Sequence, residues 1–218
     1  MKNKIFYLLL FLISLYTIGI INALNLPLLG KVIYIDPGHG GTDPGAIYND
    51  LYESNLNLQI SLKIQTELEK NGAIVYLTRY GDYDLSVKNA INRKRSDLSR
   101  RANIINDSKA DVYLSIHLNS DVSSTWQGAQ AFYDTVNDKN EVIAKIMQEQ
   151  FKIDLKTNRE YKQINGHYLY QRVKVPGVLL EVGFISNPNE RYLLKKDSYQ
   201  QKIANSIKNG LINYFTQI

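Results

Sequence analysis

The 218-residue sequence has no cysteine, only two methionines and one tryptophan. The absence of cysteine excludes disulfides, a thiolate metal site, a cysteine nucleophile and a lipid anchor on cysteine. No nucleic-acid-binding module is recognisable, so we expect no nucleic-acid partner. A net charge of +5 and a hydrophobic content of 44% are typical of a globular domain, and the positive charge favours an anionic surface such as a membrane or a cell-wall polymer.

The first thirty residues contain a long uncharged segment. Lys2 and Lys4 are followed by no charged residue over 5–30. A membrane helix needs about 20 apolar residues, and the two lysines would stay in the cytoplasm by the positive-inside rule. We therefore expect residues 1–30 to be a signal anchor or a cleaved signal peptide with a short linker, and residues 31–218 to form one extracytoplasmic domain. A buried N-terminal helix is the alternative.

Strand and helix patterns alternate in the rest of the chain. Apolar β-branched runs predict strands, and apolar residues recurring every three to four positions predict helices. Strands are predicted over 31–36, 73–79, 110–120, 128–134 and 176–186, with a short strand or extended loop over 166–173. Helices are predicted over 54–70, 97–107, 140–153 and 199–215, with a long loop over 80–96. The alternation predicts a single α/β domain with a largely parallel sheet.

Three of the predicted strands end in an ionisable residue. These are His39 after "VIYIDPG", His117 after "VYLSI" and Glu181 after "VLL". Ligands bind beyond the carboxyl ends of parallel strands, so the three side chains are expected at one edge of the sheet. Two histidines from different strands suggest a metal, although a histidine in a turn is the simpler interpretation of His39 alone. Catalytic zinc commonly has three protein ligands and one open position.

The spacing leaves the third ligand open. It must be His167, which is more often an exposed histidine, or a nearby carboxylate. Glu53 lies at the start of the first predicted helix of the domain and can reach back toward the strand ends. The other acidic candidates are Asp36, Asp43 and Asp50.

Glu181 interrupts an apolar run. Burying an unpaired carboxylate is costly, so the residue needs a partner or a chemical role. One interpretation is an ion pair with an arginine at a strand end. The other is a general base that takes a proton from an attacking water and then gives it to a leaving nitrogen.

At these residues the sequence resembles the zinc-dependent N-acetylmuramoyl-L-alanine amidases of bacterial cell walls. The resemblance runs from about Val32 to the C-terminal helix and rests on "IDPGHGG", "YESNLNL", "SIHLNS" and "LLEVGFISNPNE". It implies a six-stranded mixed sheet with helices on both faces, and hydrolysis of the amide between muramic acid and L-alanine in peptidoglycan. It also implies one zinc ion per chain bound by His39, Glu53 and His117, with Glu181 as the catalytic glutamate.

Within that family, "NRKRSDLSRRANIIN", "STWQGAQAFYD" and "TNREYKQINGHYLYQRVKVPG" look like the germination-specific amidases of spore formers. That resemblance implies action on spore cortex, followed by a peptidoglycan deacetylase that allows muramic δ-lactam to form, and leaves open a requirement for an activator protein. The basic run over 92–101 either meets stem-peptide carboxylates or is a solvated face. The alternatives are another zinc-dependent cell-wall peptidase or deacetylase, or an inactive membrane-tethered wall-binding protein.

Overall fold

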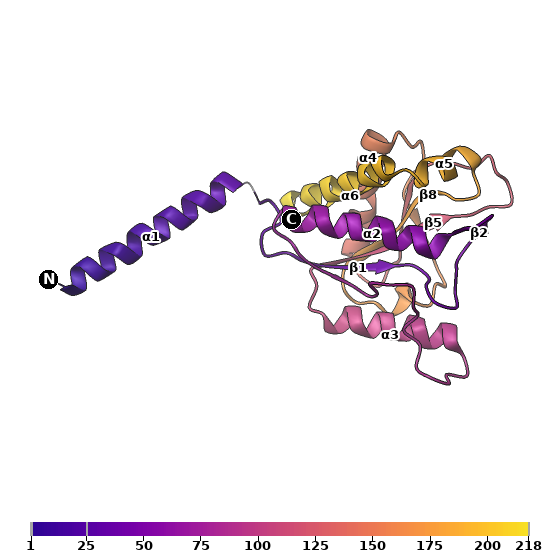
Figure 1. Ribbon diagram of the computed structural model, residues 1–218, viewed down its shortest axis with the longest axis horizontal. Helices are drawn as coiled ribbons and strands as arrows, with labels where there is room; N and C mark the ends of the chain where they lie inside the picture. Colours follow the sequence, from indigo (N-terminus) through magenta and orange to yellow (C-terminus); the bar gives the residue numbers. More distant parts are fainter. Residues whose placement is uncertain (1, 25, 218) are drawn as a thin grey trace.

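A computed structural model describes residues 2–24 and 26–217 (Figure 1). The helices are α1 (Lys2–Leu24), α2 (Glu53–Lys70), α3 (Arg93–Asp107), α4 (Lys139–Leu155), the 3-10 turn η1 (Tyr170–Arg172), α5 (Pro188–Leu194) and α6 (Asp197–Gln217). The strands are β1 (Val32–Pro37), β2 (Ile47–Tyr48), β3 (Leu51–Tyr52), β4 (Ile74–Leu77), β5 (Val112–Asn119), β6 (Gln130–Tyr133), β7 (Lys162–Gln163) and β8 (Gly177–Phe184).

Six strands form one mixed sheet in the order β4-β1-β5-β8-β6-β7. Neighbouring strands from β4 to β8 run parallel, whereas β6 is antiparallel to β8 and β7 is parallel to β6. The predicted single α/β domain with a six-stranded, mostly parallel sheet is confirmed. The short hairpin of β2 and β3 stands apart from this sheet.

Helices cover both faces of the sheet (Figure 1). The larger buried cluster joins one face to α2, α4 and α6, with Ile60, Met147 and Ile207 fully buried. The smaller cluster joins the opposite face to α3 and η1 through residues such as Ile105 and Leu179. Alternate residues of each central strand therefore enter different layers, as the two-residue period of a strand requires. Near their carboxyl ends, polar residues replace the apolar ones on the α3 face.

Two sequence predictions need correction, and one helix was missed. Helix α3 begins at Arg93 inside the predicted loop, because the side chain of Asn92 accepts a hydrogen bond from the Arg95 N–H and caps the helix. The segment 166–173 contains η1 rather than a strand, and the sixth strand is β7. Helix α5 was not predicted, although Asn187 and Pro188 form a typical start, with the Asn187 side chain accepting two backbone N–H groups.

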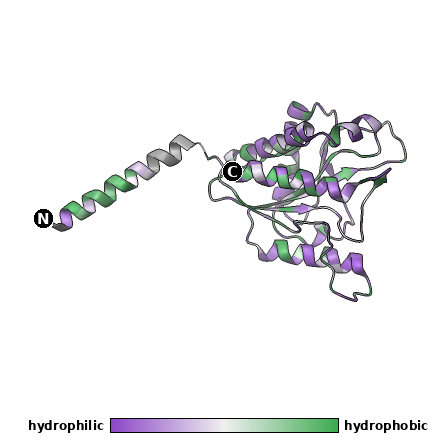
Figure 2. Ribbon diagram, in the orientation of Figure 1, coloured by the Kyte–Doolittle hydropathy of each residue, from purple (hydrophilic) through white to green (hydrophobic). Residues whose placement is uncertain are grey.

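Helix α1 lies outside the two buried clusters of the domain. Its side chains from Ile5 to Tyr16 are exposed, and Figure 2 shows hydrophobic residues along this part of the helix. No helix in the described part of the chain meets the length and hydropathy required to cross a membrane. The signal anchor or signal peptide over 1–30 stays a prediction.

Candidate active site

The carboxyl ends of β1, β5 and β8 meet at one edge, as predicted. His117 and Glu181 are direct partners in the β5–β8 register, and Pro37, two residues before His39, is the partner of Ile116. Glu53 reaches the same edge from the first turn of α2. The backbone N–H of Glu53 donates to the carbonyl of Ala46, so the β2–β3 hairpin holds the helix start against the loop that carries His39.

His39, Glu53 and His117 form a compact cluster. Oε1 of Glu53 lies 3.1 Å from Nε2 of His39 and 3.1 Å from Nδ1 of His117. One potential ligand atom from each residue lies within 4.8 Å of the others. Two atoms bound to a tetrahedral zinc at 2.0–2.1 Å would be about 3.4 Å apart. The spacing and the nitrogen and oxygen donors therefore fit a zinc site.

The carboxylate of Glu53 is buried, and both of its oxygen atoms accept hydrogen bonds. Oε1 accepts hydrogen bonds from the amide of Asn57 and the N–H of Leu118, and Oε2 accepts one from the N–H of Ala46. Burial alone would raise the pKa of Glu53, but hydrogen bonds with His117 and His39 outweigh it and hold the pKa well below its usual range. Glu53 is therefore an anion at neutral pH, as a metal ligand must be.

Glycines around the cluster leave room for the imidazole rings. A Cβ atom on Gly38 would overlap the ring of His117, and one on Gly45 would lie 2.6 Å from Oε2 of Glu53. His39 itself has φ = 62°, a left-handed conformation that is costly for a residue with a side chain. The "PGHGG" motif thus combines close packing with a strained turn that directs His39 into the cluster.

Two buried arginines hold this turn in place. Arg79 donates to the carbonyls of Pro37, Gly38 and Ser54 at 2.8–3.0 Å. Arg101 donates to the carbonyl of His39 at 2.7 Å. Neither role was predicted from the sequence. Arg79 did carry a signal, because it follows β4 in "LTR" as His39 and His117 follow their strands.

Arg101 also pairs with two acidic residues. One of them is Asp36, which the sequence offered as a candidate metal ligand. Its Nη1 lies 2.8 Å from Oδ1 of Asp36 and its Nε 2.9 Å from Oδ2 of Asp97. Thr78 donates a second hydrogen bond to Asp36. Burial raises the pKa of Asp36, but Arg101 and Thr78 reverse this effect and lower it. Asp36 is therefore a structural anion beneath the loop, separate from the His39–Glu53–His117 cluster.

The other candidates lie outside the cluster. Oδ2 of Asp43 is 3.0 Å from Nδ1 of His39, on the opposite side of the ring from Nε2. Asp50 is exposed. His167 lines the neighbouring cleft and stacks near Tyr170, with ring centroids 5.8 Å apart. The geometry favours Glu53 over these three as the third ligand.

Glu181 lines a cleft of about 260 Å³ beside the two histidines. Its Oε2 is buried and has no hydrogen-bond partner among the described residues. No ion pair joins it to an arginine in 2–24 or 26–217, which removes the support for that alternative. Burial is the main cause that raises the pKa of Glu181 to about 7, and the nearby Glu53 carboxylate adds to it.

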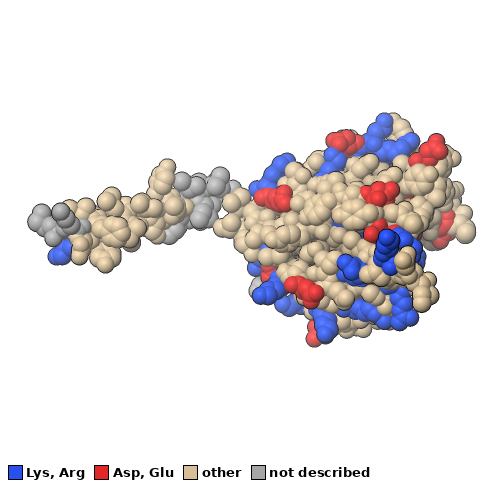
Figure 3. Space-filling model, turned by 60° about the horizontal axis from the view of Figure 1, so that its bottom comes forward, with Lys and Arg blue, Asp and Glu red and all other residues tan. Residues whose placement is uncertain are grey.

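Most side chains of the basic run already have partners. Arg93 pairs with Asp84, Lys94 lies 3.7 Å from Asp43, and Arg95 stacks on Tyr168. Figure 3 brings the α3 side forward and shows basic side chains interspersed with acidic ones. These contacts favour a structural and solvated face.

A search of protein families matches residues 33–213 to the family described as N-acetylmuramoyl-L-alanine amidase. The chain belongs to this family. The resemblance predicted from the four motifs is therefore confirmed, and this amidase acts on peptidoglycan.

Among its relatives, the germination-specific N-acetylmuramoyl-L-alanine amidase of Bacillus subtilis (strain 168) is 46% identical over 197 residues, covering 88% of this amidase and 83% of the relative. The CwlD amidase from Clostridioides difficile, solved in complex with the GerS lipoprotein, has a TM-score of 0.82 and 36% identity, covering 87% of this amidase and all of the CwlD chain (100%). The catalytic domain of CwlV from Bacillus (Paenibacillus) polymyxa has a TM-score of 0.75 and 31% identity, covering 85% and 98% respectively.

Proposed function

We propose that this amidase is a zinc-dependent hydrolase that cleaves the bond between N-acetylmuramic acid and the L-alanine of the stem peptide. The observation that carries the proposal is the His39–Glu53–His117 cluster with the unpaired carboxylate of Glu181 beside it. The two histidines and Glu53 would hold the metal. Zinc bound there supplies Lewis-acid activation of the attacking water and of the scissile carbonyl.

Glu181 is the proton carrier in this proposal. Because its pKa is raised to about 7, it can accept a proton from water and release it again near neutral pH. As the water oxygen bonds to the carbonyl carbon, Glu181 takes one proton. When the carbon–nitrogen bond breaks, Glu181 gives that proton to the nitrogen of L-alanine. The lactyl group of muramic acid leaves as a carboxylic acid, and its remaining proton passes to the amine, which gives a carboxylate and an ammonium group.

The relatives support a role in the spore. By analogy with the germination-specific relative, we place the substrate in spore cortex, where a deacetylase would act next and muramic δ-lactam would form. The GerS lipoprotein bound to the CwlD relative supports an activator partner for this amidase. Peptidoglycan lies outside the cytoplasmic membrane, so the proposal also requires export, through the N-terminal segment over 1–30.

Mass spectrometry of peptidoglycan fragments tests the reaction. The full chain with zinc should release peptides that begin with a free L-alanine amine and leave peptide-free muramic acid. Internal peptide ends would identify a peptidase instead, and acetate a deacetylase. Zinc content of the purified chain should be about one ion per chain. Unchanged fragments from a chain loaded with zinc and assayed together with a GerS-type lipoprotein would contradict the proposed activity.

A further inference from the structure

A second cleft lies at the same edge of the sheet, on the far side of Glu181 from His39. Two adjoining hollows of about 860 Å³ and about 230 Å³ share Trp126, Gln130, Arg159 and Lys162. The smaller hollow also includes Asn119, two residues after His117. Gln130 is the direct register partner of Glu181, and paired residues of adjacent strands project from the same face. The Arg159 cleft, as we name these hollows, therefore lies next to the strand position that carries Glu181.

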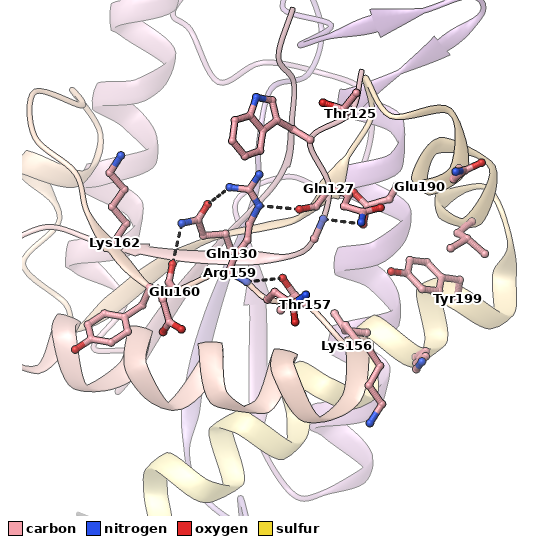
Figure 4. Close-up of a pocket in the computed structure, with 18 residues that line it drawn as sticks. Thr125, Gln127, Gln130, Lys156, Thr157, Arg159, Glu160, Lys162, Glu190 and Tyr199 are labelled. Carbon is pink, nitrogen blue, oxygen red and sulfur yellow. Dashed lines mark hydrogen bonds between the residues drawn. The ribbon is translucent and has the colours of Figure 1, made fainter. Parts of the chain in front are cut away.

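Arg159 is held rigidly in this cleft (Figure 4). Its guanidinium lies 5.1 Å from the ring centroid of Trp126 and 4.5 Å from that of Phe184. Nε donates to the carbonyl of Gln127 and Nη1 to Oε1 of Gln130. Nη2 donates no hydrogen bond within the described part of the chain. One edge of a fixed, half-buried cation is thus left to face a ligand.

Two carboxylates of the Arg159 cleft, those of Glu190 and Asp121, act on the charge of Arg159 from beyond ion-pair distance. No carboxylate lies within ion-pair distance of it among residues 2–24 and 26–217. Glu160 instead pairs with Lys152 at 2.8 Å. Glu190, which also lines the cleft, accepts hydrogen bonds from the backbone N–H groups of Gly128 and Phe184. A planar guanidinium in this state is suited to bind a carboxylate.

We propose that the Arg159 cleft binds a carboxylate of the stem peptide, two to three residues beyond the scissile amide. Adjacent strands are about 4.8 Å apart, so Gln130 on β6 lies about 5 Å from Glu181 across the sheet, and Nη1 of Arg159 lies a further 3.0 Å from Oε1 of Gln130. An extended peptide advances about 3.3 Å per residue, so its second or third residue reaches Arg159 when the amide lies at Glu181. This inference rests on the proposed function and deepens it.

The test uses two ligands that differ in one group. In both ligands the γ-carboxyl group is blocked as a methylamide, as the next peptide bond would block it. The N-acetylmuramoyl-L-alanyl-D-glutamate form then has the α-carboxylate as its single carboxylate, and the N-acetylmuramoyl-L-alanyl-D-isoglutamine form has a carboxamide in its place. Calorimetric binding is measured with the zinc-loaded full chain carrying Glu181→Gln, which prevents turnover. We expect the carboxylate ligand to bind about 10-fold more tightly or better, as one charge-assisted hydrogen bond predicts.

That preference should disappear with Arg159→Gln and persist with Arg100→Gln, which removes the same charge from an exposed position on α3. The two ligands are first compared on the chain with Arg159 intact, so this part of the test does not depend on whether an Arg159 variant folds. Equal affinities, no measurable binding of either ligand, or a preference that survives Arg159→Gln would overturn the inference. Binding of peptide-free glycan that depends on Arg159, without carboxylate preference, would assign the cleft to sugar instead. A chain that shows the preference but cleaves no peptidoglycan would contradict the proposed function alone.

Discussion

Nη2 of Arg79 lies 2.9 Å from the carbonyl oxygen of Gly38. The same nitrogen lies 2.8 Å from the carbonyl oxygen of Ser54. Gly38 precedes His39 and Ser54 follows Glu53, so one guanidinium fixes the distance between two candidate metal ligands that lie on different segments. Residues that orient metal ligands in this way typically contribute 10-fold to 100-fold to metal affinity.

Arg79→Lys should therefore weaken zinc binding by about 10-fold to 100-fold. A lysine has one ammonium group and cannot reproduce the fork that bonds the carbonyls of Pro37, Gly38 and Ser54 and, through Nη1, that of Gly81. Competition with a chromophoric chelator measures the affinity. Arg191→Lys is the matched control, because Arg191 also donates to two carbonyls, those of Ile185 and Ser186, away from the cluster. Equal losses of zinc affinity in Arg79→Lys and Arg191→Lys would show that Arg79 does not position the metal ligands.

Glu181→Gln should reduce turnover by about 100-fold to 10,000-fold, since the amide cannot accept the proton of the attacking water. Zinc content should stay at the wild-type level, because Glu181 is outside the three-ligand cluster. Steady-state rates on peptidoglycan fragments and metal analysis of the same sample check both parts. Glu149→Gln, at an exposed position on α4, should leave the rate unchanged. Full activity of Glu181→Gln would reassign the base.

Gly38→Ala should abolish zinc binding while the domain remains folded. The added Cβ would overlap the imidazole of His117, and the ring can escape only by leaving the position that faces Glu53. Circular dichroism tests whether the fold is retained, and metal analysis tests whether zinc is bound. Gly81→Ala is the control, because its Cβ would meet only the ring of Tyr83, at 3.3 Å, and the substitution keeps the backbone carbonyl that accepts a hydrogen bond from Arg79. Normal zinc content in Gly38→Ala would show that His117 is not confined there.

The Asp36–Arg101 pair predicts an acid-sensitive component of stability. The folded-state pKa of Asp36 is lowered, so this contribution is complete above the unfolded-state pKa of about 3.9 and is lost as the pH falls through the folded-state pKa. Asp36→Asn should lower the free energy of unfolding at pH 7 by about 1.5–3 kcal/mol, because it removes one of the two carboxylates that pair with the buried Arg101 and leaves Asp97 as the other.

Urea unfolding of the metal-free chain at pH 7 and across pH 4–2 measures this effect. The wild-type chain should lose stability more steeply toward low pH than Asp36→Asn does. Asp138→Asn, at an exposed position on the surface, should follow the wild-type curve. Parallel curves for the wild type and Asp36→Asn would assign the acid sensitivity to other groups.

The largely parallel sheet and the edge that carries the site could be predicted from the sequence, because apolar runs end in His39, His117 and Glu181, whereas the order of the strands was not predicted. Spacing alone did not select Glu53, since its approach depends on the β2–β3 hairpin, which consists of two residues per strand. The roles of Arg79 and Arg101 were also beyond prediction. Their partners are mainly backbone carbonyls brought close by folding, and a carbonyl has no signature in the sequence.

The metal cluster also connects distant parts of a chain that has no cysteine. Glu53 and His117 are 64 positions apart; Glu53 begins α2 and His117 lies near the carboxyl end of β5. An ion shared by both would close that loop as a cross-link does, and closing a loop of this length restricts the unfolded chain by about 4 kcal/mol. The edge of the sheet that carries the cluster would then be among the most metal-sensitive parts of the fold. Removing the metal with a chelator would loosen the β1–α2 connection and would also stop hydrolysis.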